Sequence, residues 1–298
     1  MNYEFDLLGK AKYFSIGSLI AIIVGAILIL TIGMNLGIDF TGGTKFEIVF
    51  NEEVSTAELR SFLTDSDQLS ALSGSKLQNV QGQNEIDIST KLDVGQNAEV
   101  LDELERQLAR EFDISEGNIS RKSVGEKISQ ELQTKGWQAI GLALLVILIY
   151  ISWRFRLRYA VGAVAAVIHD VVIAMAIFAI FRIEINLPTI GAFLTIVGYS
   201  LNDTIVYFDR IRENASKKIA RKGSTFALIN KSINQSLSRT ISTSTTTFLP
   251  VIALVAFGGP VLRAFSLALL IGVIVGTYSS IYVASPIVYL WDKYLASE

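Results

Sequence analysis

Six long apolar stretches alternate with polar ones along the 298-residue chain. About 20 helical residues cross a hydrocarbon layer of about 30 Å, so each stretch is long enough to span a membrane. The pattern therefore predicts a membrane α-helical bundle of six transmembrane helices. We expect these helices at residues 13–34, 137–153, 159–181, 187–208, 236–257 and 261–290.

The polar segment at 35–133, between the first two spans, has the pattern of an inserted α+β domain. Strand-like alternation occurs at residues 44–50, 75–80, 85–90 and 118–124, with a turn at Gly82. A helix is expected at 55–65, opened by a capping box of Ser55 and Glu58, and a second helix at 97–112. The order strand, helix, strand, strand, helix, strand is that of a ferredoxin-like domain.

Charge predicts how the chain is oriented in the membrane. Residues 35–135 hold 19 Asp and Glu against 10 Lys and Arg, whereas the remainder holds 9 against 16. Because basic residues favour the cytoplasmic side, we expect residues 1–12, the basic loop 209–235 and residues 292–298 to be cytoplasmic. Residues 35–133 are then extracytoplasmic, and the other five spans lie within 134–291. A cleaved signal peptide fits the first span less well, since the apolar stretch is long and no A-x-A site ends it.

Composition narrows the possible chemistry. The chain is 51% hydrophobic, contains no cysteine and has one histidine. Disulfides and thiolate chemistry are therefore excluded, and a protein-only zinc site is not expected. The sequence also has no phosphate-binding loop and no nucleophile paired with a base. We expect neither a catalytic residue, a cofactor nor a metal, so any driven process takes its energy from a partner or an ion gradient.

The fourth span contains two residues that a membrane helix avoids, Asn202 and Asp203. A carboxylate at the centre of a bilayer costs about 3 kcal/mol or more unless it is paired, hydrated or protonated, which makes Asp203 a candidate functional residue. Arg239 lies at a similar depth in the fifth span, on a consecutive and antiparallel helix. We therefore predict that Arg239 is the partner of Asp203.

The fifth span is also rich in hydroxyl groups, with nine in the twelve residues 236–247. Thr243 and Thr246 fall on the same helical stripe as Arg239. Two interpretations are open. The hydroxyls allow close packing by bonding to carbonyls of their own helix, or they form a hydrated lining through which a proton reaches Asp203.

The third and sixth spans contain two further polar or small-residue features. His169 and Asp170 lie in the middle of the third span and form either a proton relay or a pair satisfied by interhelical hydrogen bonds. Gly272 and Gly276 form a G-x-x-x-G pattern in the sixth span, which is common where helices pack closely.

Three blocks of the sequence carry a family resemblance. They are G-I-D-F-T-G-G at residues 37–43, G-Y-S-L-N-D-T-I-V-Y-F-D-R-I-R-E-N at 198–214, and F-S-L-A-L-L-I-G-V-I-V-G-T-Y-S-S-I-Y-V-A-S-P at 265–286. In this order the blocks resemble the SecD/SecF family of the bacterial Sec export machinery, within the resistance-nodulation-division superfamily. The residues that match the family motifs are Gly37, Asp39, Gly42, Gly43, Gly198, Asp209 and Arg210.

This resemblance implies a function in protein export. In that family SecD and SecF form a pair of six-span halves, separate or fused, and this chain looks like a separate SecF half in the bacterial cytoplasmic membrane. The resemblance implies that the pair uses the proton-motive force beside SecYEG, after the SecA motor, to complete polypeptide release. It also implies that Asp203 and Arg239 transfer protons.

The implied partners are SecD, SecYEG, the translocating polypeptide and membrane lipid, with YajC and YidC as further candidates and no nucleic acid. Three other functions compete with this one. In a purely structural subunit, Asp203 and Arg239 would only hold SecD in place. A small-molecule efflux half-transporter shares the fold, and an intramembrane aspartyl protease would use Asp170 and Asp203 but lacks a G-x-G-D motif.

Overall fold

The computed structural model describes residues 5–80, 84–216 and 224–294, and the chain divides into two compact units. One unit combines residues 1–35 with residues 138–298 and is helical. The other covers residues 36–137 and contains the sheet.

Among the described residues, six helical stretches are long and apolar enough to cross a membrane, which fits the predicted membrane bundle. Polypeptide segments that cross lipid as helices satisfy their backbone hydrogen bonds internally, so long apolar runs fold in this way. The helices are α1 (Leu7–Ile32), α5 (Glu126–Arg154), α6 (Leu157–Ile180), α7 (Leu187–Ser216), α8 (Thr225–Phe257) and α9 (Gly259–Ser279), which continues through a π-helical turn (Ser280–Ala284) into α10 (Ser285–Tyr294).

Helices α6, α7 and α9 form the centre of the helical unit. About half of the apolar part of α6 and of α7 is buried, whereas α1, α5 and α8 expose most of theirs. Small and aromatic side chains fill the centre, among them Ala163, Tyr207 and Phe208. The exposed apolar side chains of the outer helices suit a lipid or protein environment rather than water.

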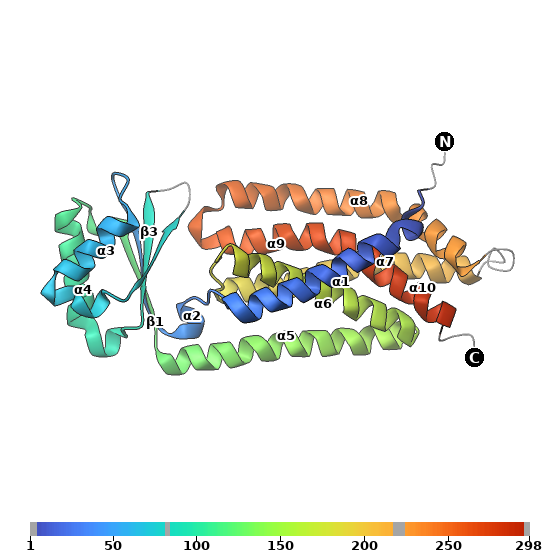
Figure 1. Cartoon of the computed structure of the whole chain (residues 1–298), viewed down its shortest axis with the longest axis horizontal. Helices are drawn as coiled ribbons and strands as arrows, with labels where there is room; N and C mark the ends of the chain where they lie inside the picture. The colour runs from blue at the N-terminus through green and yellow to red at the C-terminus, as the bar shows by residue number, and fades with distance from the viewer. Residues whose placement is uncertain (1–4, 81–83, 217–223, 295–298) are drawn as a thin grey trace. The chain divides into compact units, whose positions relative to one another are not determined.

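In the described part of the basic segment predicted at 209–235, the chain is helical. Helix α7 continues to Ser216 and α8 begins at Thr225, and residues 217–223 lie outside the described residues. Asn214, which is buried, donates hydrogen bonds to Ser232 at 2.9 Å and to Gln235 at 2.8 Å. These contacts hold the two helices together beyond their apolar portions. The start of α1, the end of α7, the start of α8 and the end of α10 lie at one end of this unit (Figure 1).

The other unit is built on four strands, β1 (Gly43–Val49), β2 (Lys76–Val80), β3 (Glu85–Thr90) and β4 (Ile119–Val124). The sheet order is β2-β3-β1-β4, with every neighbouring pair antiparallel. Helix α3 (Thr56–Asp65) joins β1 to β2, and α4 (Val94–Glu111) joins β3 to β4. Three short helical turns, α2 (Ile38–Thr41), η1 (Asp67–Leu72) and η2 (Glu116–Asn118), were not expected from the sequence. The predicted turn at Gly82 lies outside the described residues.

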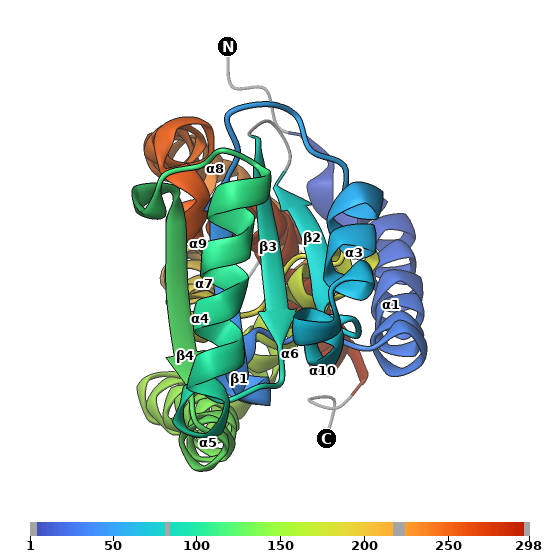
Figure 2. The ribbon, with the colours of Figure 1, turned by 90° about the vertical axis from the view of Figure 1, so that its left-hand side faces the viewer.

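Helices α3 and α4 cover the same face of the sheet (Figure 2). Strand residues such as Phe46 and Ile88 and helix residues such as Leu63 and Leu104 are fully buried between the two layers. The start of α3 is as predicted, because the Ser55 side chain accepts a hydrogen bond from the Glu58 backbone N–H at 3.1 Å.

The G-G pair at the start of β1 has a clear backbone role. Gly42 and Gly43 have φ angles of 70° and 107°, which side chains other than glycine rarely adopt. A Cβ on Gly43 would lie 2.0 Å from the carbonyl oxygen of Thr90 in the neighbouring strand. The motif therefore lets β1 begin directly against β3.

We predict that Gly43→Ala destabilises the sheet unit by more than about 2 kcal/mol, because it adds both a backbone strain and a collision with a main-chain atom. Hydrogen exchange of the β1 and β3 amides in the full-length protein measures this loss. Gly74→Ala is the matched control, since nothing lies within 4 Å of its added Cβ. Equal protection in both variants would contradict the prediction.

Glu85 gives the sheet unit a pH dependence. Burial, together with the negative charges of Asp87 and Glu47, raises the pKa of its carboxyl above the ordinary 4.5. The folded state then binds this proton more tightly than the unfolded state, so stability falls as pH rises from about 4.5 through the raised pKa.

We therefore expect Glu85→Gln to stabilise the sheet unit at pH 7 or above and to have little effect near about pH 4. Hydrogen exchange of β3, corrected for the intrinsic exchange rate at each pH, checks this in the full-length protein. The exposed Glu99 provides the control variant Glu99→Gln. A stabilisation that is the same at both pH values would contradict the assignment to Glu85.

Candidate functional site

Asp203 lies on the buried side of α7, with 2% of its surface exposed. The hydroxyl of Ser244, on the neighbouring helix α8, lies within reach of its carboxylate. Within the part of the chain that the structure describes, the Oδ2 atom of Asp203 has no hydrogen-bond partner. An incompletely satisfied carboxylate in an apolar helix is costly, which is the usual mark of a functional rather than a structural group.

Arg239 is placed on α8, where its positive charge acts on Asp203. The guanidinium itself is exposed, and no direct ion pair joins it to Asp203 among the described residues. The structure thus brings the two predicted residues onto adjacent helices without closing them into a pair. Their role in proton transfer stays a prediction.

Among the hydroxyl groups of α8, those of Thr243, Thr246 and Thr247 bond to carbonyls of their own helix. Thr243 donates to the carbonyl of Arg239 at 2.9 Å, and Thr246 donates to the carbonyl of Thr243 at 2.9 Å. Ser244 instead shares a 2.7 Å hydrogen bond with Thr277 of α9. These bonds are those of the packing interpretation, and the hydrated lining stays a prediction.

Asn202 is not beside Asp203, because its side chain is exposed on the other side of α7. Gly198, one turn earlier, is exposed too, and a Cβ there would meet nothing within 4 Å. Arg239 of α8 is exposed as well. Asn202, Gly198 and Arg239 therefore lie on the outer surface of membrane-spanning helices, where apolar side chains are expected.

His169 and Asp170 form a second buried polar cluster, on α6. The His169 Nδ1 atom lies 2.8 Å from Asp170 Oδ1, while the hydroxyls of Ser200 and Ser279 donate to Asp170 Oδ2 at 2.5 and 2.8 Å. The cluster therefore connects α6 with α7 and α9. Ser200 and Ser279 were missed from the sequence. Both spans contain several other polar residues, so no signal in the sequence singled out these two serines.

The remaining motif residues lie elsewhere. Asp209 contacts Arg212 at 3.0 Å and Arg154 at 3.8 Å, and Arg210 donates to Glu213 at 2.8 Å. These ion pairs lie at the end of α7. Gly37 caps the short helix α2, which contains Asp39 and leads into Gly42 and Gly43 of the sheet unit.

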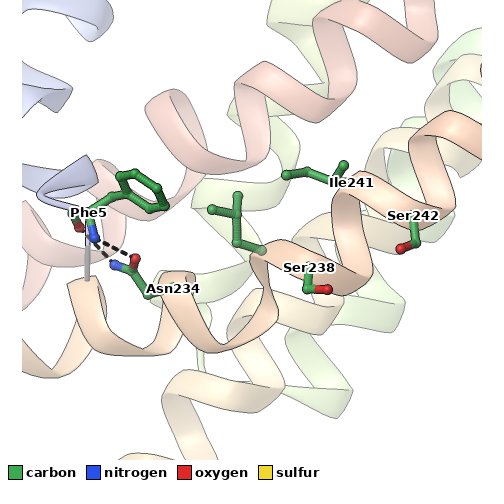
Figure 3. Close-up of a pocket in the computed structure, with 6 residues that line it drawn as sticks. Phe5, Asn234, Ser238, Ile241 and Ser242 are labelled. Atoms are coloured by element: carbon green, nitrogen blue, oxygen red, sulfur yellow. Dashed lines mark hydrogen bonds between the residues drawn. The ribbon is translucent and has the colours of Figure 1, made fainter. Parts of the chain in front are cut away.

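A shallow groove of about 370 Å³ lies between the N-terminal segment and α8. Figure 3 shows Phe5 and Asn234 joined at one end of it, with Ser238, Ile241 and Ser242 further along α8. The Phe5 N–H donates to Asn234 Oδ1 at 2.8 Å, and Asn234 Nδ2 donates to the Phe5 carbonyl at 2.8 Å. The lining residues that the structure describes, Phe5, Asn234, Leu237, Ser238, Ile241 and Ser242, include no titratable side chain.

A second asparagine, Asn230, lies one turn before Asn234 on the same helix. Its Oδ1 atom accepts hydrogen bonds from the backbone N–H groups of Leu7 and Leu8, both at 3.0 Å. These two N–H groups belong to the first turn of α1, which has no intrahelical acceptors. The two asparagines therefore attach the start of α1 to α8.

Comparison with known proteins decides the family. The model of the C-terminal region of the protein export membrane proteins SecD and SecF matches residues 104–294, and the SecD/SecF GG motif matches residues 27–54. The chain belongs to the SecD/SecF family. The resemblance stated from the three sequence blocks is thereby confirmed, and the matched regions contain both Asp203 and the G-G pair.

Several SecD/SecF relatives match over almost the whole chain. The protein translocase subunit SecF of Calditerrivibrio nitroreducens is 40% identical over 96% of this chain and 93% of its own length. The corresponding subunit of Thermodesulfovibrio yellowstonii is 43% identical over 97% and 95%. The protein translocase subunit SecDF of Thermus thermophilus is 39% identical over 97% of this chain, which spans only 39% of that longer protein.

Two solved structures support the same fold. A crystal structure of SecDF from Thermus thermophilus, described as a translocon-associated membrane protein, matches 98% of this chain at 38% identity with a TM-score of 0.90. A structure of SecDF in a super-membrane-facing form matches the same share at 37% identity with a TM-score of 0.71. This chain covers 39% of each of those proteins.

Helix α9 packs closely on α7 through its two glycines. A Cβ on Gly272 would lie 2.2 Å from Cγ1 of Ile196, and a Cβ on Gly276 would lie 3.3 Å from the Cβ of Ser200. The G-x-x-x-G pattern thus has the packing role expected of it.

We predict that Gly272→Ala destabilises the helical unit by about 1–3 kcal/mol through overpacking against Ile196. Thermal unfolding in detergent measures this, with Gly191→Ala as control because nothing lies within 4 Å of its Cβ. The added substitution Ile196→Ala removes the three atoms that collide and should restore part of the stability. A double variant less stable than Gly272→Ala alone would contradict this explanation.

Proposed function

We propose that this chain is the SecF half of a SecD–SecF complex that promotes protein export. The near full-length match to SecF subunits carries this proposal, and the matching fused SecDF relative supports SecD as the partner. A chain that corresponds to part of a fused protein is expected to meet the remainder as a separate subunit.

The complex acts in the bacterial cytoplasmic membrane, with both termini inside. Arg154 ends α5, Arg156 and Arg158 lie at the start of α6, and Arg210 and Arg212 lie near the end of α7. These helix ends lie at one end of the helical unit (Figure 1), which supports this orientation. The α+β unit is then extracytoplasmic. Its antiparallel order β2-β3-β1-β4, with a helix in each crossover, is the arrangement expected of a ferredoxin-like domain.

The proton-motive force drives late export steps at SecYEG that do not depend on SecA. A proton that moves down a membrane potential releases about 2.3 kcal/mol per 100 mV, which is enough to bias a conformational equilibrium. Asp203 takes up this proton and Arg239 responds to the change in its charge. The unsatisfied Oδ2 atom supports this role, because a permanent structural pair would leave no such atom.

The outer domain moves as the proton is taken up and released, and it acts on the translocating polypeptide. YajC, YidC and membrane lipid are the further expected contacts.

We expect Asp203→Asn to abolish the stimulation of export by the proton-motive force, because the amide keeps the shape of the side chain but cannot ionise. Export of a preprotein into membrane vesicles, with and without an imposed proton gradient, measures this. Asp209→Asn is the matched control, since Asp209 lies at the helix end among arginines. Full stimulation in Asp203→Asn would contradict the proposal.

Co-purification with SecD separates this function from a purely structural role. In the proposed function, SecD still co-purifies with the Asp203→Asn and Arg239→Met variants although stimulation is lost. Loss of SecD together with activity would instead assign the two residues to assembly. Substrate-stimulated proton flux with small molecules, independent of Sec components, would favour the efflux alternative.

A further inference from the structure

His169 and Asp170 are a second ionisable pair in the helical unit that the proposed function does not use. Asp170 is fully buried and 3% of His169 is exposed. A carboxylate removed from water and left without a compensating charge is among the most costly groups that a protein can bury. Whatever balances this charge must therefore lie beside it.

The contacts of the carboxylate account for both of its oxygens. Oδ2 accepts hydrogen bonds from Ser200 of α7 and Ser279 of α9, while Oδ1 faces the Nδ1 atom of His169. A proton lies between Oδ1 and Nδ1, because two bare acceptors would repel at 2.8 Å. The hydroxyls contribute dipoles but no net charge.

Among the described residues, the side chains shown to contact the pair from other helices are uncharged. On α9 the Tyr278 ring stacks on His169 with centroids 6.0 Å apart, and its hydroxyl bonds to Ser18 of α1 at 2.8 Å. Tyr282, in the π-helical turn, packs on Tyr278.

Charged residues of the packed helices lie away from the pair. Arg263, near the start of α9, is 16 residues from Ser279, or about 24 Å along the helix. Lys10 and Lys12 of α1 are exposed, Arg158 of α6 pairs with Asp292 of α10, and Asp203 of α7 faces α8. Among the residues that the structure describes, His169 is the one titratable group that acts on Asp170. Electrical balance at this position therefore depends on a proton.

We propose that His169 and Asp170 form a second proton-binding site, separate from Asp203, that holds one proton more than a carboxylate and a neutral imidazole. The proton is carried as imidazolium beside carboxylate or as neutral imidazole beside carboxylic acid, and both forms have no net charge. Because Ser200 and Ser279 stabilise the charged oxygen, the proton affinity of the site depends on the contact of α7 and α9 with α6. Ser200 lies one turn before Asp203, so α7 contributes a residue to each of the two sites.

His169 is the only histidine in the sequence, which makes the test direct. Full-length protein with ¹⁵N-labelled histidine and an affinity tag free of histidine, placed in lipid bilayers, gives imidazole signals from this residue alone. We expect nitrogen NMR between about pH 5 and 9 to show a protonated His169, or infrared spectroscopy to show a carboxylic acid band that Asp170→Asn removes.

Substitutions should move the proton affinity in opposite directions. Asp170→Asn removes the negative partner and should lower the proton affinity of His169 at least about tenfold. Ser200→Ala removes a donor that favours the carboxylate, so the site should hold its proton to higher pH. Asp209→Asn, at the end of α7 among arginines, is the control and should leave the His169 signals unchanged.

The proposal is overturned if His169 is neutral throughout and no carboxylic acid band depends on Asp170. It is also overturned if Asp170→Asn leaves both the NMR and infrared signals unchanged. These spectroscopic outcomes do not depend on export, so they are separate from the failure or success of the proposed function.

Discussion

Burial of charge in an apolar helical unit is the constraint on which this structure depends. Two buried carboxylates, those of Asp170 and Asp203, are stabilised to different extents. Asp170 has both oxygens engaged, by an imidazole and two hydroxyls from three helices. Asp203 keeps one oxygen without a partner among the described residues, and it lies beside a helix whose Arg239 is exposed. The first arrangement ties the helices together, whereas the second leaves a carboxylate ready to change its interactions.

Small residues and polar contacts are linked in this unit. Gly276 lets α9 approach Ser200 closely, and the same approach brings Ser279 within 2.8 Å of Asp170. Ser280, at the beginning of the π-helical turn, shares a 2.9 Å hydrogen bond with Thr204 of α7. A bulkier side chain on α9 would therefore disturb hydrogen bonds as well as packing.

The sequence predicted the existence of the elements better than their ends or their partners. Hydropathy locates the part of a helix that lies in hydrocarbon, so it identified six spans but ended α7 before its polar extension to Ser216. Strand alternation and the Ser55 cap placed the sheet unit within a few residues. The partners of Asp170 could not be predicted, because the rotation of one helix against another is set by three-dimensional packing. For the same reason, proximity in sequence gave no sign that Asn202 points away from Asp203.

The attachment of α1 to α8 has a genetic consequence. Asn230 and Asn234 bond to main-chain atoms of Phe5, Leu7 and Leu8, and not to their side chains. The N-terminal segment can therefore diverge in sequence without losing its anchor, because every residue other than proline offers the same N–H and carbonyl groups. The side chains that this contact requires are those of two asparagines, more than 220 positions away from the N-terminal segment. The N-terminal segment can therefore change in sequence and still be attached to α8.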